Sequence, residues 1–304
     1  MKDKIKVYFI ATRPWSFILT FISVTGGALS AFIETGVFDV TLYLLTLIGV
    51  IALHASANLF NDYFDTVKGI DTTESPTAKY RPHPILTGMM SADTLKSYAL
   101  AMLLLGLSIG AYLAMLKGLI VFVLGAIGGL LTISYSGPGG YKYKALGELA
   151  VFLVWGPIIF LGSYLVQTGF LSLYPVIVSI PVGMYVSAVL LANNLRDMKI
   201  DSESGIKTLP LVLGKERGLK LYEILILAPY IVVVLLVLAG VTPIYTLLTL
   251  ITIPEAIRLK RAFEKEIPPA ADPMTAKLLQ DFGLLYITGL FIPLVLPINF
   301  KPII

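Results

Sequence analysis

The sequence contains no cysteine, only two histidines, and few charged residues for its length of 304. The lack of cysteine excludes disulfide bonds, thiolate metal sites and thiol nucleophiles. The two histidines, His54 and His83, are not spaced as a pair of zinc ligands. Charged residues make up 14% of the chain, compared with about 25% in a typical soluble domain. The sequence therefore argues against an ordinary soluble fold and leaves oxygen atoms as the main candidate ligands.

Long apolar segments fill most of the chain. Hydrophobic residues make up 57% of it, and the mean hydropathy is +0.85. A membrane-spanning helix needs about 20 mainly apolar residues. Nine segments approach that length, near residues 14–33, 40–62, 95–116, 118–136, 148–168, 173–196, 221–240, 243–262 and 279–299. The sequence therefore predicts an all-α, multi-pass integral membrane protein of the cell membrane, with nine transmembrane helices in one bundle.

The basic residues indicate how these helices cross the bilayer. All but Lys117 and Lys301 of the 23 basic residues fall in the N-terminal tail, in the loops after even-numbered spans, or at the flanks of those spans. Cytoplasmic loops carry an excess of Lys and Arg, so we expect a cytoplasmic N-terminus. The loops on that side are also the longer ones, and loops carry binding residues, so we expect the active site to face the cytoplasm. No basic stripe interleaved with aromatic residues predicts a nucleic-acid partner, and no obligatory protein partner is evident.

Two acidic stretches stand where apolar spans end. The first, at 58–71, reads N-L-F-N-D-Y-F-D-T-V-K-G-I-D, and the second, at 193–201, reads N-N-L-R-D-M-K-I-D. Asp62 and Asp197 are 135 positions apart, with four spans in each interval. We therefore expect a single domain over 1–304 that contains two four-helix halves, about 10–140 and 145–265, and a ninth helix.

Each acidic stretch places oxygen ligands on one helical face. Residues three or four apart lie on the same side of a helix. The first set is Asn58, Asp62 and Asp65, and the second is Asn193, Asp197 and Asp201. Oxygen ligands without thiolates suit Mg²⁺, which is commonly completed by substrate phosphate oxygens. The pattern predicts two Mg²⁺ ions that bridge a diphosphate between the two sets.

Basic residues near these stretches could complete an anion site, because Arg and Lys bind phosphate oxygens. Each is equally explained by the charge bias of the loops on this side. The residues concerned are Lys68, Lys79, Arg81, Lys142, Lys144, Arg196 and Lys199.

Three longer segments resemble a known family. They are N-D-Y-F-D-T-V-K-G-I-D at 61–71, Y-S-G-P-G-G-Y-K-Y-K-A-L-G-E at 135–148, and N-N-L-R-D-M-K-I-D-S-E-S-G-I-K-T-L-P-L-V-L-G at 193–214. Together with Arg13-Pro14 before the first span and Gly88 in the second loop, they resemble the UbiA superfamily of intramembrane aromatic prenyltransferases. The resemblance covers nearly the whole chain.

The resemblance implies a nine-helix bundle with metal-binding motifs at the ends of helices two and six. It assigns metal ligation to Asn58, Asp62, Asp65, Asp197 and Asp201, and catalysis to those four aspartates and Lys142. We expect substrate contacts from Asn58, Asn61, Arg13, Arg81, Lys68, Asp71, Tyr135, Tyr141, Asn193, Asn194 and Arg196.

One departure from the family pattern points to a branch. Many members carry a further Asp four residues after the position of Asp65, where this chain has Gly69 and places the acid at Asp71. This variant, the wording of the second motif and the L-G-E at 146–148 resemble the 1,4-dihydroxy-2-naphthoate polyprenyltransferases of menaquinone biosynthesis. The expected partners are a prenyl diphosphate, an aromatic acceptor and the lipid bilayer.

Tyrosines near the second segment could stabilise a developing allylic cation by cation–π contact, and Tyr135, Tyr141 and Tyr143 are the candidates. Two other functions remain open from the sequence. A related branch prenylates geranylgeranylglyceryl phosphate to make archaeal ether lipids. A membrane transporter would also carry intramembrane acids and internal pseudo-repeats.

Overall fold

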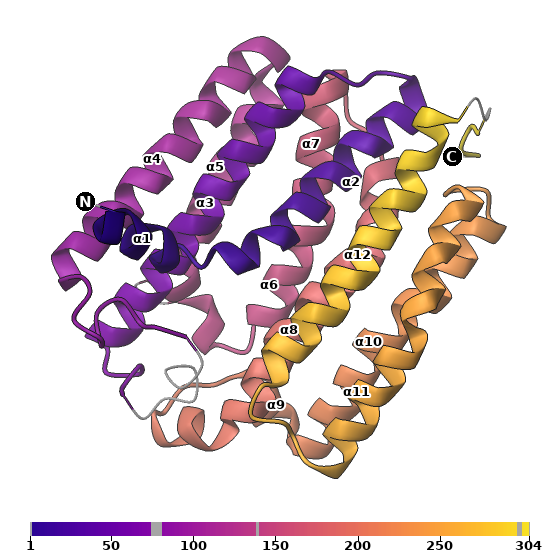
Figure 1. The fold of residues 1–304 in the computed structure, drawn as a ribbon. Coiled ribbons are helices and arrows are strands. Elements are labelled where there is room, and N and C mark those ends of the chain that lie inside the picture. Colours follow the sequence, from indigo (N-terminus) through magenta and orange to yellow (C-terminus); the bar gives the residue numbers. More distant parts are fainter. Residues whose placement is uncertain (1, 74–80, 138–139, 297–299, 304) are drawn as a thin grey trace.

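The computed structural model describes residues 2–73, 81–137, 140–296 and 300–303. Lys79, one of the basic residues that could complete an anion site, lies outside these ranges. Long helices run side by side through the molecule, and the short α1 (Lys2–Ala11) lies across their direction (Figure 1). Within this part of the chain the secondary structure is helical, apart from an isolated bridge between Lys144 and Lys207. The all-α prediction is confirmed.

Eight helical segments are long and apolar enough to cross a membrane. The prediction of a multi-pass membrane protein is therefore confirmed. The segments are α2 (Phe17–Thr35) with the preceding η1 (Pro14–Ser16), α3 (Val40–Val67), α4 (Ala92–Lys117), α5 (Leu119–Ser136), α6 to α7 (Gly147–Thr168), α8 (Tyr174–Glu203), α10 (Lys215–Leu238) and α12 (Ala271–Val295).

The predicted span at 243–262 differs from the other eight. Its first half is the 3₁₀ helix η5 (Ile244–Thr252), and its second half is α11 (Ile253–Lys265), which is rich in charged residues. In η5, Thr246, Thr249 and Thr252 each donate a hydroxyl hydrogen bond of 2.8 Å to the carbonyl three residues earlier. These bonds match the three-residue turn of a 3₁₀ helix. The described chain thus has eight candidate spans by length and apolarity, with η5 and α11 at the place of the ninth predicted helix.

Three hydrophobic clusters of described residues hold the bundle together. The largest one joins α2, α8, α10 and α12 and includes several buried tyrosines. The hydroxyl of Tyr185 donates to the carbonyl of Ile226, and that of Tyr286 donates to the carbonyl of Val178, each at 2.9 Å. A second cluster joins α3 and α4, and a third joins α3, α4, α5 and α7. Burying these hydroxyls requires such partners, so the cross-helix bonds fix how α8 meets α10 and α12.

The fifth span is interrupted by an irregular turn near its middle. Between α6 (Gly147–Leu153) and α7 (Ile159–Thr168) the chain forms a π-helical turn, η4 (Val154–Ile158), which contains Pro157. Proline cannot donate the usual helical hydrogen bond, and π turns are common at functional sites. The carbonyl of Trp155 in this turn accepts a 2.6 Å hydrogen bond from Ser23 of α2.

The two helices that carry the acidic stretches end in the same kind of turn. At the end of α3, Gly69 adopts φ +72°, the amide of Ile70 donates to the carbonyl of Asp65, and the amide of Gly69 donates to that of Thr66. At the end of α8, Gly205 has φ +69°, and Ile206 donates to the carbonyl of Asp201. Both patterns are Schellman motifs, in which glycine supplies the left-handed residue.

Candidate active site

A cavity of about 710 Å³ lies between α2, α3, α8 and α12. Residues of both acidic stretches line it, although they are far apart in the sequence. Its polar lining includes Arg13, Asn58, Asn61, Asp65, Asp71, Arg81, Lys142, Asn193, Asn194, Asp197, Asp201 and Asp272. The fold thus brings the two stretches to one space.

Asp62 is completely buried, and two arginines hold its carboxylate. Arg81 donates to Oδ1 at 2.9 Å and to Oδ2 at 3.2 Å, and Arg13 forms an ion pair with Oδ1. Burial acts to lower the pKa of Arg13, but the nearby Asp62, Asp71 and Asp65 carboxylates together raise it above its usual value. Arg13 is therefore a cation, and the first stretch keeps two guanidinium groups beside the cavity.

Asp65 has three polar partners of its own. Lys142 Nζ lies 2.5 Å from its Oδ2, Tyr143 donates its hydroxyl to Oδ1, and the amide of Asn61 donates to Oδ2. Lys142 Nζ also lies 5.5 Å from the ring centre of Tyr135. Lys142 therefore faces the cavity between a carboxylate and an aromatic ring.

Asn58 is fixed by the N-terminal segment. Its side-chain nitrogen donates to the carbonyl of Thr12 at 3.0 Å and to the hydroxyl of Ser16 at 3.1 Å. Because the nitrogen points toward these groups, the amide oxygen points away from them. His54, one turn earlier, is buried, lies 2.8 Å from the hydroxyl of Thr20, and packs its ring edgewise on Trp155.

The second stretch is organised around Arg196. This guanidinium donates to Asp197 Oδ1 at 2.8 Å and Oδ2 at 2.7 Å, and to Asn193 Oδ1 at 2.8 Å. It also pairs with Asp272 at the start of α12. Asp201, one turn further along α8, forms no ion pair within the described part of the chain. One cation therefore serves two carboxylates here, and a third carboxylate stands beside them.

Asn194 links the second stretch to α6. Its side-chain nitrogen donates to Glu148 Oε1 at 2.8 Å, and both side chains are buried. Asn194 also lines the cavity. Glu148 therefore orients an amide of the cavity wall from behind.

Two loops meet beside the cavity and position Lys142. The amide of Ala145 donates to the carbonyl of Lys207 at 2.7 Å, and the amide of Lys207 donates to that of Tyr143 at 3.3 Å. Ala145 has φ +57°, which is uncommon for a residue with a Cβ. The loop that carries the Asp65 partners is thus tied to the loop that follows α8.

Two predicted substrate contacts have structural partners in this fold. Lys68 donates to the carbonyls of Ser136 and Gly137 at 2.7 and 3.0 Å, which satisfies the C-terminal end of α5. Tyr141 donates to the carbonyl of Leu131 at 3.0 Å. Lys68 lies outside the described lining of both cavities, whereas Tyr141 lines only the smaller one.

The smaller cavity, of about 150 Å³, adjoins the large one between α3, α5 and the α6 to η4 segment. The two cavities share seven lining residues, so they form neighbouring parts of one space. The shared residues are Arg13, His54, Asn58, Asn61, Tyr135, Val151 and Trp155. The walls of the smaller part are mainly apolar and aromatic, and Arg13 is its one charged residue among the described ones.

The environment fixes the protonation of several groups in the loops. Burial raises the pKa of Tyr141 to about 12, and burial together with Asp65 raises that of Tyr143 further. Both phenols therefore stay protonated and act as donors near neutral pH. Burial would raise the pKa of Asp71, but hydrogen bonding to His83 and the nearby cations lower it overall. Asp71 is thus ionised at the cavity edge.

No local sequence pattern marks three residues near this site. Asp272 belongs to a helix far along the chain, His83 follows the second span without a motif, and Glu148 is part of a segment that resembles the family. Each is brought to the site by tertiary packing. A carboxylate or imidazole next to apolar helix ends was the available hint for the first two.

The donor set suits a hard divalent cation. The groups that line the cavity from both stretches are carboxylates and amides, which offer oxygen atoms. Mg²⁺ prefers such oxygen ligands and binds through a few carboxylates together with substrate phosphates. The Arg and Lys side chains among them match the negative charge of a phosphate group. The residues present therefore fit both an Mg²⁺ ion and a diphosphate.

Comparison with known proteins supports this chemistry. The model of the UbiA prenyltransferase family matches residues 19–274. UbiA prenyltransferase domain-containing protein 1 of Mus musculus is 33% identical over 296 residues, which cover 96% of this chain and 85% of the mouse protein.

Solved structures share the fold. A UbiA homologue from Archaeoglobus fulgidus bound to GPP and Mg²⁺ superposes with a TM-score of 0.64 and 17% identity, over 95% of this chain and 100% of that one. A digeranylgeranylglyceryl phosphate synthase superposes with the same TM-score and 22% identity, over 95% and 99%. The family match and the mouse relative extend over most of the sequence, so this chain belongs to the UbiA prenyltransferase family and is a prenyltransferase enzyme.

Proposed function

We propose that this enzyme transfers a polyprenyl group from its diphosphate to an aromatic acceptor, 1,4-dihydroxy-2-naphthoate, in menaquinone biosynthesis. The observation that carries this proposal is that residues of both acidic stretches line one cavity together with Arg13, Arg81 and Lys142. Such a cavity can hold one diphosphate between carboxylates that bind Mg²⁺ and cations that bind phosphate.

The proposed metal ligands are those that the acidic stretches offer: Asn58, Asp62 and Asp65 on α3, and Asp197 and Asp201 on α8. When bound there, Mg²⁺ would neutralise the negative charge of the departing diphosphate. Both oxygens of Asp62 already accept hydrogen bonds from Arg81. Ligation by Asp62 therefore requires the arginines to shift, and the diphosphate offers them an alternative anion.

The remaining steps belong to the protein side chains. Arg13, Arg81 and Lys142 hold the diphosphate while its bond to C1 of the prenyl group breaks. The walls of the cavity exclude water from the allylic cation, and Tyr135 and Tyr143 offer aromatic faces for it. A bond then forms between C1 and an aromatic carbon of the acceptor. That carbon loses its carboxylate as carbon dioxide, or it loses a proton, for which the released diphosphate is an acceptor.

The smaller cavity is the proposed acceptor pocket. Its apolar and aromatic walls, which include Trp155, Tyr135 and His54, suit a planar ring. Arg13 is the one charged residue in the described lining of this pocket, so an acceptor carboxylate would lie close to the same guanidinium that holds the diphosphate. The Gly69 and Asp71 variant and the wording of the second motif also favour the naphthoate branch.

The prenyl chain is proposed to enter from the lipid. Ile18 and Leu19 of α2 and Ala276 of α12 line the large cavity, so its apolar part extends between these helices. A chain of isoprene units could lie there with its diphosphate at the acidic stretches. We place this end of the cavity on the cytoplasmic side because the basic loops lie there.

Prenyl transfer by purified enzyme in proteoliposomes tests this proposal. With Mg²⁺ and a radiolabelled prenyl diphosphate, Asp62→Ala and Asp197→Ala should each reduce turnover by at least ~100-fold, a typical loss when charge stabilisation is removed. Turnover near the wild-type rate in either variant would contradict the assignment. Mass spectrometry of the products formed with 1,4-dihydroxy-2-naphthoate and with geranylgeranylglyceryl phosphate would decide the acceptor.

A further inference from the structure

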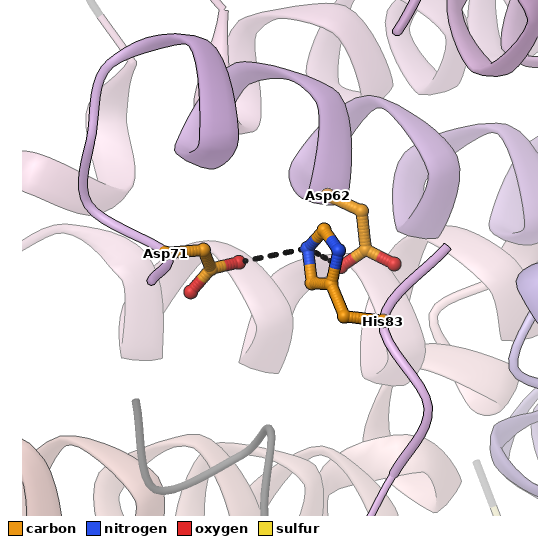
Figure 2. A group of neighbouring side chains, drawn as sticks. All are labelled: Asp62, Asp71 and His83. Atoms are coloured by element: carbon orange, nitrogen blue, oxygen red, sulfur yellow. Dashed lines mark ion pairs between the residues drawn. The ribbon is translucent and has the colours of Figure 1, made fainter. Parts of the chain in front are cut away.

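His83 lies behind the first acidic stretch, in the loop that leads to α4. Its side chain is 3% exposed, and it points between Asp62 and Asp71, as Figure 2 shows. One donor atom of each of the three side chains lies within 4.8 Å of the others. Such a group could be interpreted as a metal site with an imidazole ligand.

The surroundings of the imidazole indicate a different role. The amide of Leu86 donates to Nδ1 at 3.3 Å, so Nδ1 carries a lone pair and not a proton. A neutral imidazole then carries its proton on Nε2. A metal bound to Nε2 would instead require the proton on Nδ1, where it would face the Leu86 amide.

The neighbours of Nε2 are acceptors, which supports this tautomer. Asp71 Oδ2 lies at 3.4 Å and Asp62 Oδ1 at 3.7 Å. The hydroxyl of Thr66 lies at 3.4 Å and already donates its proton to the carbonyl of Asp62 at 2.7 Å. Its oxygen can therefore only accept from Nε2. Three oxygen atoms thus surround one N–H donor.

We propose that His83 is a positioning residue for the metal-diphosphate site, and that it acts as a donor from Nε2 and not as a metal ligand. Asp62 and Asp71 are both negatively charged and would repel each other across this short distance. The Nε2–H group of His83 lies between the two carboxylates, attracts both of them, and so keeps Asp71 close to Asp62. The end of the first stretch is thereby kept in the geometry that lines the cavity.

This inference rests on the proposed binding of metal and diphosphate at Asp62. Residues that orient metal ligands typically change metal affinity by about 10- to 100-fold when they are replaced. We therefore expect His83 to affect metal affinity without contacting the metal. The sequence alone does not predict this role, because Asp71 and His83 are separated by twelve positions.

Two substitutions of His83 test the roles of its two ring nitrogens separately. His83→Asn keeps an acceptor near the position of Nδ1 for Leu86 but removes the donor toward the carboxylates. His83→Gln keeps a donor near the position of Nε2. Binding of Mn²⁺ to purified protein in the presence of geranyl thiodiphosphate, a non-reacting prenyl diphosphate, is measured by electron paramagnetic resonance.

We expect His83→Asn to raise the Kd for Mn²⁺ by about tenfold and His83→Gln by less than about threefold. In an Asp71→Asn background, the additional effect of His83→Asn should nearly vanish, because the two side chains act as one unit. The thermal unfolding temperature without metal should be similar for the Asn and Gln variants. If His83 had a purely structural role, the variant with the weaker Mn²⁺ affinity would also have the lower unfolding temperature.

Three results would overturn the inference. They are an unchanged Kd in His83→Asn, an equal loss in both variants, or ¹⁴N coupling to Mn²⁺ in the spin-echo spectrum of the wild-type protein, which would show direct ligation by imidazole. Asp62→Ala serves as the parallel test of the proposed function. If that variant binds Mn²⁺ normally, the site itself is wrong. If it does not while His83→Asn binds normally, only the role of His83 is wrong.

Discussion

The ends of α3 and α8 have the same backbone conformation but differ in the ion pairs of their side chains. Each helix finishes in a Schellman motif with a glycine in the left-handed region, and the carbonyl that closes the turn belongs to Asp65 in α3 and to Asp201 in α8. The side chains of these two aspartates are in opposite situations. Asp65 contacts Lys142, Tyr143 and Asn61, whereas Asp201 has no ion pair among the described residues.

The same contrast extends along both helix ends. In the first, Asp62 and Asp65 are paired with Arg13, Arg81 and Lys142. In the second, Arg196 pairs with both Asp197 and Asp272. In the proposed function, the cations of the first end would pair with the diphosphate. The second end has more carboxylates than ion-paired cations among the described residues, and it would bind a divalent cation. The same terminal turn therefore holds side chains with different partners at the two ends.

The largest expected difference between the two ends concerns metal binding without substrate. Asp201→Asn should reduce Mn²⁺ affinity by about 100-fold, because its carboxylate has no competing ion pair. Asp65→Asn should reduce it by less than about tenfold, because Lys142 already neutralises Asp65. Electron paramagnetic resonance of Mn²⁺ titrated into the detergent-purified protein measures both. Equal losses would show that the charge contrast does not determine where metal binds.

Turnover should instead depend more strongly on the first end. Lys142→Met should lower kcat by about 100-fold, because it removes a cation from the departing diphosphate and leaves Asp65 without its ion pair. Lys142→Arg should retain more activity, since it keeps the charge. Lys144→Met in the same loop is the matched control, because Lys144 is exposed. A kcat for Lys142→Met equal to that of the control would remove Lys142 from the site.

How far the sequence could predict this molecule depends on whether the signal is local. The eight long helices are predictable because each is a mainly apolar segment near the length that a spanning helix needs. The remaining span was predicted as an ordinary transmembrane helix, but threonines at three-residue spacing and the charges of α11 gave a 3₁₀ helix followed by a polar helix.

The site shows the same limit. The acidic stretches were visible as helix ends, whereas Asp272 and His83 reach them only through tertiary packing. The charge and position of Lys68 predict a substrate contact, and in the structure its side chain donates to the C-terminal carbonyls of α5. A basic residue in a loop cannot be assigned to a ligand until the neighbouring helix ends are placed.

A moderate effect is expected at Arg196, the shared cation of the second end. Arg196→Lys keeps the charge but loses the planar pair of hydrogen bonds to Asp197 and the simultaneous contact with Asp272. We expect the concentration of Mg²⁺ needed for half-maximal prenyl transfer to change by about tenfold, with a smaller change in kcat. The Mg²⁺ dependence of product formation measures both. A change in kcat alone would indicate that Arg196 acts on the prenyl substrate and not on the metal ligands.

The smallest effect tests the shared backbone of the two ends. A Cβ at Gly69 or Gly205 would meet no atom within 4 Å, so alanine at either position costs only the strain of positive φ, about 1–2 kcal/mol. Both variants should therefore lower thermal stability by similar amounts, while Gly110→Ala within α4, which also has open space, should not.

The two glycine variants should differ in activity. Gly69→Ala also displaces Asp71 from His83, whereas the residues that follow Gly205 lead to Lys207 and its bridge to the Lys142 loop. A larger loss of Mn²⁺ affinity in Gly69→Ala, and of kcat in Gly205→Ala, would show that identical turns are used to place different partners.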